Sequence, residues 1–349
     1  MAGETRAGEL RETDRPKCHS NNRGESDTVE ALRLPASYPN DVRYVETIET
    51  HRSWVFLTET CAYKLKKPVC LDASGGLMRE ARRRLCELEL ELNRRLAASV
   101  YLGVVPVTVS HAHISVDGAG LPIDWLVKMR RLPRQRMLDQ LIADGTLREV
   151  EVDALVASLV RFYASADSAV FDGNSYGKRL AADIGSKRSS LERPHYGLSP
   201  RDIHDLASRQ RSWLTRHEEL LQRRGAGVVD AHGDLRPEHI CLEPDPVIID
   251  CLEFDRELRL LDPVSELSFL LLECRRLGAA WVGDRLIRQY GALTGDQASA
   301  SLVAFYESYH ALIRAAIAVW HLDDVSPVNP DAWRARAQLY LQLGLQRLS

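Results

Sequence analysis

The residues of this chain best suited to catalysis are two aspartates, Asp234 and Asp250, which lie 16 positions apart. Asp234 follows His232-Gly233 in a polar turn, and Asp250 ends a short apolar run. The β-branched residues of Val247–Ile249 predict a buried strand that places Asp250 at its tip. In phosphoryl transfer, one such carboxylate orients a hydroxyl or water, and the other holds Mg²⁺ against phosphate oxygens. Two ordinary turn aspartates are the alternative interpretation, because Asp favours turns.

A lysine-rich segment is a second indication of phosphate chemistry. Cys61–Val69 reads Cys-Ala-Tyr-Lys-Leu-Lys-Lys-Pro-Val and is expected to form a strand, with Lys64 and Lys66 on the same face. A lysine on such a strand can neutralise the α- and β-phosphates of a nucleotide. The alternative is an edge strand that lysines protect from pairing with other chains.

The helix expected after this strand should carry the carboxylate that holds the lysine. Its candidates are Glu80, Glu87, Glu89 and Glu91. Glu89 lies four residues after Leu85 and three before Leu92, which belong to the apolar stripe of the helix. Glu89 is therefore expected to face inward beside the core.

The order of elements around these residues predicts an α+β protein with two lobes. Strands are expected at 42–48, 53–58, 61–69, 101–109, 113–116 and 122–129, with a long helix at 76–98. Helices dominate the rest of the chain and are expected at 136–142, 149–166, 177–191, 200–224, 264–277, 281–290, 299–322 and 330–348. The predicted division is a flexible tail at 1–30, a small lobe of antiparallel sheet and helix at 31–132, and a larger helical lobe at 133–349.

Composition narrows the class of protein. The chain has 349 residues, of which 45% are hydrophobic and 27% charged, as in ordinary soluble domains. A net charge of −3 gives no sign of nucleic-acid binding. The sequence has no long apolar run and no recognisable signal peptide, so we expect no membrane partner. The seven cysteines include no CxxC pair, which favours reduced thiols in the cytoplasm.

The acidic segment resembles the aminoglycoside phosphotransferase-like branch of the protein-kinase-like superfamily. The matching residues are His232-Gly233-Asp234 and Ile249-Asp250. The stretch from Asp250 through Phe254, and then Leu261-Asp262-Pro263 and Glu266-Leu267, is similar to an uncharacterised bacterial group within that branch. The resemblance implies a protein-kinase-like two-lobe fold, ATP and Mg²⁺ as cofactors, and a small-molecule hydroxyl as acceptor.

The resemblance also implies roles for the residues that match. Asp234 corresponds to the catalytic base or hydroxyl-positioning residue, and Asp250 to the main metal ligand. The phosphate contact falls on Lys66, with Lys64 as the other possibility, and Glu89 corresponds to its carboxylate partner.

The expected hinge between the lobes reads Asp124 to Pro133. An adenine would be held there by backbone groups and an apolar pocket. Met129 and Arg131 are predicted as nucleotide contacts from their position alone. The basic stretch 178–193 is expected either to line an acceptor groove or to form a solvated helical face.

Two features depart from the family pattern. His239 stands where an Asn would supply an oxygen to a metal, and Mg²⁺ prefers oxygen to nitrogen ligands. The adjacent Glu238 could supply that oxygen instead. The chain also has no glycine-rich phosphate loop between its first two strands and no Walker motif. One-metal catalysis, a rearranged site that uses Glu238, and a weak or inactive kinase all remain open.

The leading hypothesis is therefore an ATP-dependent small-molecule kinase. The second hypothesis is a pseudokinase, which would bind nucleotide or a partner with little or no transfer activity. Comparing ATP consumption by wild type and Asp234→Ala would discriminate between the two. A metal phosphohydrolase is disfavoured, because the sequence shows no His/Asp cluster for a two-metal site. The pattern leaves open the acceptor, the choice between ATP and GTP, and the oligomeric state.

Overall fold

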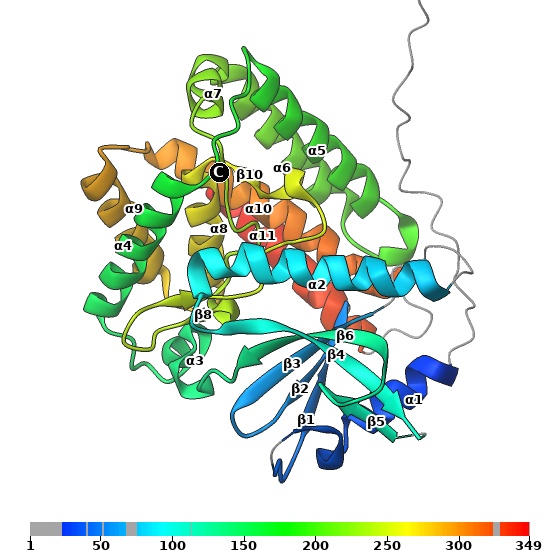
Figure 1. Ribbon diagram of the computed structural model, residues 1–349. Coiled ribbons are helices and arrows are strands. Elements are labelled where there is room, and N and C mark those ends of the chain that lie inside the picture. Colours follow the sequence, from blue (N-terminus) through cyan, green and yellow to red (C-terminus); the bar gives the residue numbers. More distant parts are fainter. Residues whose placement is uncertain are drawn as a thin grey trace, which may run out of the picture. The chain divides into compact units, whose positions relative to one another are not determined.

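The computed structural model describes residues 23–39, 41–50, 52–67, 75–111, 113–323 and 329–348. They form two compact units (Figure 1). The first unit comprises residues up to Leu90 together with Tyr101–Arg131. The second comprises Glu91–Val100 and the chain from Leu132 onward. The boundary between residues 131 and 132 lies one residue from the boundary expected at 132/133. Residues 91–100, expected in the small lobe, belong to the helical unit.

The first unit is built on one six-stranded antiparallel sheet (Figure 1). Its strands are β1 (Glu46–Glu49), β2 (Ser53–Leu57), β3 (Cys61–Lys66), β4 (Tyr101–Ser110), β5 (His113–Val116) and β6 (Leu121–Arg130), in the order β1-β2-β3-β6-β4-β5. Phe56, Leu65 and Leu126 from three neighbouring strands are fully buried in its core. The expected strand boundaries hold within a few residues, and Val69 lies outside the described residues.

Two helices belong wholly or partly to this unit. The helix α2 runs from Gly75 to Ala97, within one residue of the expected bounds at both ends. The helix α1 (Arg23–Leu32) was not expected, so the prediction of a flexible tail is wrong for residues 23–30. Val29 and Leu32 are spaced i, i+3 and are buried against the sheet, which offsets the ordering entropy. Residues 1–22 lie outside the described residues.

The second unit is mainly helical and has one large apolar core. Its helices are α3 (Leu138–Ala143), α4 (Glu149–Ser165), α5 (Ser175–Leu191), α6 (Pro200–Arg216), α7 (Glu218–Gly225), α8 (Pro263–Arg276), α9 (Ala280–Thr294), α10 (Ala300–Trp320) and α11 (Pro330–Arg347). The segment Ala300–Asp323, which includes α10, is long and apolar enough to span a membrane, but 78% of its apolar window is buried inside this unit. It is therefore a core helix here.

The single helix expected at 200–224 is interrupted at His217, and this prediction is corrected to α6 and α7. The backbone of His217 leaves the helical region at φ −124° and ψ 29°. Its ring stacks on Trp213 with centroids 4.1 Å apart, and its Nδ1 lies 2.8 Å from the carbonyl oxygen of Trp213. A side chain that bonds the i−4 carbonyl competes with the helical ladder, which accounts for the break.

Four two-residue strands frame the two acidic turns of the second unit. They are β7 (Val229–Asp230), β8 (Ile240–Cys241), β9 (Val247–Ile248) and β10 (Leu260–Leu261). β7 pairs with β10 and β8 pairs with β9, both antiparallel. The strand expected at 247–249 is thus present as β9, which ends two residues before Asp250.

Candidate active site

The first unit contains a buried cluster of two lysines and one glutamate. Lys64 and Lys66 lie on the same face of β3, while Tyr63 and Leu65 on the opposite face enter the core. The Nζ of Lys66 lies 2.5 Å from Oε2 of Glu89, and the Nζ of Lys64 lies 3.0 Å from Oε1. Two ammonium groups thus share one fully buried carboxylate on α2. Ammonium groups held in place in this way can contact phosphate oxygens.

The two residues of the expected hinge that were predicted to contact a nucleotide lie at the end of β6 and just after it. Met129 is nearly buried, with its backbone opposite Ala62 of β3. The guanidinium of Arg131 donates to the carbonyl oxygen of Thr58 at 2.7 Å and pairs with Glu46 at 3.1 Å. Arg131 therefore braces the β1–β2 hairpin, and its contact with a nucleotide stays a prediction, as does that of Met129.

The turn that carries Asp234 depends on a glycine. Gly233 has φ +86°, a left-handed conformation that glycine adopts without steric cost. A Cβ at this position would lie 2.9 Å from Cδ1 of Leu252 and 3.1 Å from Cγ of Arg259. The glycine of the His-Gly-Asp sequence is thus required by its backbone conformation and by the lack of room for a side chain.

Glu266, in the first turn of the helix α8, holds the backbone of the His232-Gly233-Asp234 turn in place. Its carboxylate accepts the backbone N–H of His232 at 3.0 Å and that of Gly233 at 2.6 Å, and also the hydroxyl of Tyr163 at 2.8 Å. Burial raises the pKa of Glu266, while these donors act in the opposite direction. No role was expected for Glu266 from the sequence, where it entered only as part of the family resemblance.

His232 joins the two acidic turns. Its Nε2 lies 3.0 Å from the carbonyl oxygen of Ile249, and its Nδ1 accepts the backbone N–H of Asp234 at 3.3 Å. A neutral imidazole with its proton on Nε2 satisfies both contacts. Burial, followed by the nearby His239, lowers the pKa of His232 to about 3. The ring thus stays neutral and ties the residue before Asp250 to Asp234.

This buried imidazole predicts a loss of stability in acid. The folded pKa is depressed below the ordinary value of 6.5, so the unfolded chain binds more protons as the pH falls below 6.5. We expect His232 to contribute a loss of up to about 1.4 kcal/mol per pH unit between that value and its folded pKa. Urea unfolding of wild type and His232→Gln at pH 7.5, 6 and 5 measures it. The variant should show a shallower dependence, and equal slopes would contradict the prediction.

Asp234 and Asp250 lie on either side of His239. The carboxylate Oδ2 of Asp234 lies 3.7 Å from Nδ1 of His239, and Oδ2 of Asp250 lies 3.5 Å from its Nε2. Arg236 contacts the same group, with Nη2 at 2.9 Å from both Oδ2 of Asp234 and Nε2 of His239. The structure therefore brings the two aspartates together around one imidazole. Sequence reasoning missed Arg236, whose only signal was its charge two residues after Asp234.

Asp250 also has an unusual backbone. Its φ is +64°, a left-handed conformation that is uncommon for residues other than glycine. Such conformations persist where the surroundings fix them, and they concentrate at functional sites. The Asp250 side chain is 42% exposed.

Glu238 does not join these residues. Its Oε1 accepts from Nη2 of Arg276 at 3.2 Å, and Arg276 is also paired with Glu273 at 2.7 Å. Across the described part of the chain, no group of three or more His, Cys, Asp or Glu side chains is arranged to hold a metal ion. Of the three ligands expected from the sequence, only Asp250 and His239 are adjacent.

Comparison with known proteins defines the fold. No protein-family model matches the chain. Solved structures that it resembles include the GDP complex of aminoglycoside 2′-phosphotransferase-IIIa, at 14% identity and a TM-score of 0.55, covering 94% of this chain and 99% of that one. A choline/ethanolamine kinase family protein from Mesorhizobium loti gives 16% identity and a TM-score of 0.51, covering 93% and 98%. The chain has a protein-kinase-like fold.

Sequence relatives of this kinase-like chain are themselves uncharacterised. One protein from Mycobacterium tuberculosis and one from Mycobacterium bovis are each 32% identical over 285 residues, which is 79% of this chain and 55% of theirs. The chain thus spans about half the length of these curated relatives. The fold class and the resemblance expected from the sequence are confirmed at the level of the fold.

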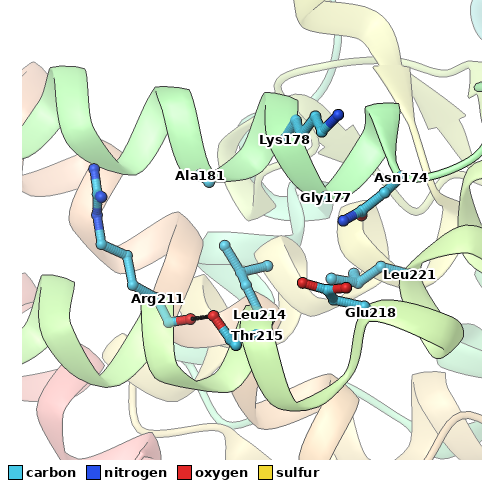
Figure 2. Close-up of a pocket in the computed structure, with 9 residues that line it drawn as sticks. All are labelled: Asn174, Gly177, Lys178, Ala181, Arg211, Leu214, Thr215, Glu218 and Leu221. Carbon is cyan, nitrogen blue, oxygen red and sulfur yellow. Dashed lines mark hydrogen bonds between the residues drawn. The ribbon is translucent and has the colours of Figure 1, made fainter.

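A cavity of about 310 Å³ lies in the helical unit of the kinase-like fold, between α5 and the pair α6 and α7 (Figure 2). Lys178, from the basic stretch, lines it together with Arg211 and Glu218. None of its lining residues comes from the turns that carry Asp234 and Asp250. The cavity therefore gives no support for an acceptor groove beside the acidic turns.

Proposed function

We propose that the chain is an ATP-dependent phosphotransferase that transfers the γ-phosphoryl group to a hydroxyl of a small molecule. The observation that carries this proposal is the buried ion pair of Lys66 and Glu89 on β3 and α2. This pair is the part of a kinase site that positions the α- and β-phosphates. Support for nucleotide binding comes from the fold, because a structural neighbour was solved as a GDP complex.

Each group of residues has a separate task in this proposal. The ammonium of Lys66, and that of Lys64 beside it, neutralise phosphate oxygens, while Glu89 fixes the position of both. Asp234 accepts a hydrogen bond from the acceptor hydroxyl, orients it for in-line attack and takes up its proton. Arg236, 2.9 Å from the Asp234 carboxylate, supplies positive charge beside the transferring group.

Asp250 is the residue that would hold Mg²⁺, an ion that binds through one or two carboxylates and completes its shell with waters and phosphate oxygens. His239 does not fit this role, because Mg²⁺ prefers oxygen ligands and Nε2 of His239 lies 2.9 Å from Nη2 of Arg236. When bound, Mg²⁺ neutralises charge on the phosphate oxygens. Because Glu238 is paired with Arg276, one-metal catalysis is favoured over a rearranged site that uses Glu238. We infer a cytoplasmic location from the reduced cysteines and from a core helix in place of a membrane span.

A pseudokinase remains the second candidate. The observation that favours it is the contact of both Arg236 and His239 with Asp234, which occupies part of the carboxylate expected to act as base. A protein of this kind would bind nucleotide through Lys66 and Glu89 without transferring phosphate.

Asp250→Asn tests the proposal. We expect the variant to bind nucleotide in the absence of Mg²⁺ as wild type does, but to lose most of the Mg²⁺-dependent gain in affinity, because a neutral amide is a weaker ligand for a hard cation. Thermal shift with ATP, with and without Mg²⁺, measures this difference. Transfer of labelled γ-phosphate across a panel of hydroxyl-bearing metabolites, detected by mass spectrometry, measures catalysis. A wild type that binds ATP but labels no acceptor, with no Asp250-dependent ATP consumption, would support the pseudokinase.

A further inference from the structure

Three arginines converge on the carboxylate of Asp230, four residues before Asp234. Arg259 donates from Nε to Oδ1 at 2.8 Å and from Nη2 to Oδ2 at 3.1 Å. Arg256 donates from Nε to Oδ2 at 3.2 Å, and Arg95 from Nη1 to Oδ1 at 3.3 Å. Burial alone would raise the pKa of Asp230, but the arginines, Arg259 foremost, hold it below its usual value. The group is therefore an ionised anchor at the start of the catalytic turn.

Arg95, near the end of α2, contacts the chain on both sides of the acidic pair. Its Nη1 donates to the carbonyl oxygen of Asp230 at 2.9 Å, and its Nη2 to that of Ala231 at 3.0 Å. The same Nη2 lies 3.3 Å from Sγ of Cys251, the residue after Asp250. One guanidinium thus joins the strand that precedes the Asp234 turn to the segment that follows Asp250.

Two further bonds reinforce this connection. Asn93, almost fully buried and two residues before Arg95 on α2, accepts the backbone N–H of Cys251 at 2.9 Å. Arg259 donates from Nη1 to the carbonyl oxygen of Leu252 at 2.8 Å while it holds Asp230. The segment after Asp250 is therefore tied to α2 at Cys251 and, through Arg259, to Asp230 at Leu252.

A guanidinium is suited to this task because it presents several donors in a rigid plane. A lysine ammonium could neutralise Asp230, but it could not hold two successive backbone carbonyls and an adjacent segment in one fixed geometry. Charge alone therefore does not explain the contacts of Arg95.

We propose that Arg95 is a positioning residue that fixes the Asp234 turn relative to Asp250. Its effect on activity rests on the proposed phosphotransferase function, whereas its effect on the local backbone does not. Outer partners that orient functional ligands are typically worth about 10- to 100-fold in metal affinity or activity. We expect Arg95→Ala to lower Mg²⁺-dependent nucleotide affinity and turnover by about that factor.

The test compares Arg95→Ala and Arg95→Lys with Arg84→Ala, which removes an exposed arginine from α2. Hydrogen exchange should become faster in peptides that cover 229–236 and 249–253 in both Arg95 variants, and stay unchanged in Arg84→Ala. Arg95→Lys should remain impaired, and added guanidinium ion at millimolar concentration should partly restore Arg95→Ala.

Three results would overturn the proposal. They are unchanged exchange at both turns in Arg95→Ala, full recovery by Arg95→Lys, and an equal loss in Arg84→Ala. If wild type transfers no phosphate at all, the proposed function fails, but hydrogen exchange still decides whether Arg95 positions the turns. If Arg95→Ala does not fold, the exchange comparison is made with Arg95→Lys alone, and wild-type exchange at both turns then refutes the proposal.

Discussion

Replacing Asp234 with alanine is expected to reduce phosphate transfer by about 10²- to 10⁴-fold, the usual contribution of a positioned general acid or base. The variant loses the oxygen that would receive the acceptor proton. It also loses the anion that Arg236 contacts from Nε at 3.0 Å, so this cation becomes free to move. Nucleotide binding should persist, because Lys66 and Glu89 belong to the other unit of the chain. Initial rates with labelled ATP, together with ATP affinity by calorimetry, separate the two effects.

Asp245→Ala is the matched control for this experiment. Asp245 is an exposed aspartate in the turn between β8 and β9, between the two functional carboxylates in sequence. Its removal changes the net charge by the same amount and should leave turnover unaltered. Equal turnover in Asp234→Ala and wild type would exclude Asp234 as the base and would leave the pseudokinase as the better description.

The parts of the site that sequence could predict are those set by local periodicity. Alternation along β3 placed Lys64 and Lys66 on one face, and the helical period of α2 placed Glu89 beside the core. Both rules act over a few residues. The family resemblance then paired Lys66 with Glu89, and the two side chains now lie 2.5 Å apart. The β-branched run before Asp250 was informative for the same reason.

The parts that sequence could not predict depend on contacts between distant segments. Glu266 accepts two backbone N–H groups of a turn 34 and 33 residues away, and no local pattern encodes that distance. Arg95 reaches residues 135 and 136 positions further along the chain. The helix α1 was missed because its composition is polar apart from a few side chains, and the sheet that buries Val29 and Leu32 forms only in the folded protein. The residues that support the site from distant segments, such as Glu266 and Arg95, are therefore identified only by the tertiary structure.

Replacing Glu89 with alanine is expected to destabilise the first unit by about 3–5 kcal/mol, the usual result of breaking a buried ion pair. Lys66 and Lys64 would both lose the carboxylate that they share, although their ammonium groups would remain largely shielded from water. ATP binding should weaken as well, because the two lysines would no longer be held in one place. Urea unfolding measures the free energy of unfolding, and thermal shift with ATP measures the binding. Glu87→Ala is the matched control, because Glu87 is half-exposed on the same helix and pairs with Arg83 at i,i+4.

A compensating variant distinguishes the charge effect from loss of packing. If the charge of the two lysines causes the loss, Glu89→Leu combined with Lys64→Met and Lys66→Met should recover most of the stability, because apolar groups of similar volume often replace buried ion pairs at little cost. The same triple variant should bind ATP no better than Glu89→Ala, because it lacks the cations that would neutralise the phosphates. Recovery of stability without recovery of binding would show that this ion pair is retained for the nucleotide. A triple variant that binds ATP like wild type would refute the assignment of Lys66 and Lys64 to the phosphates.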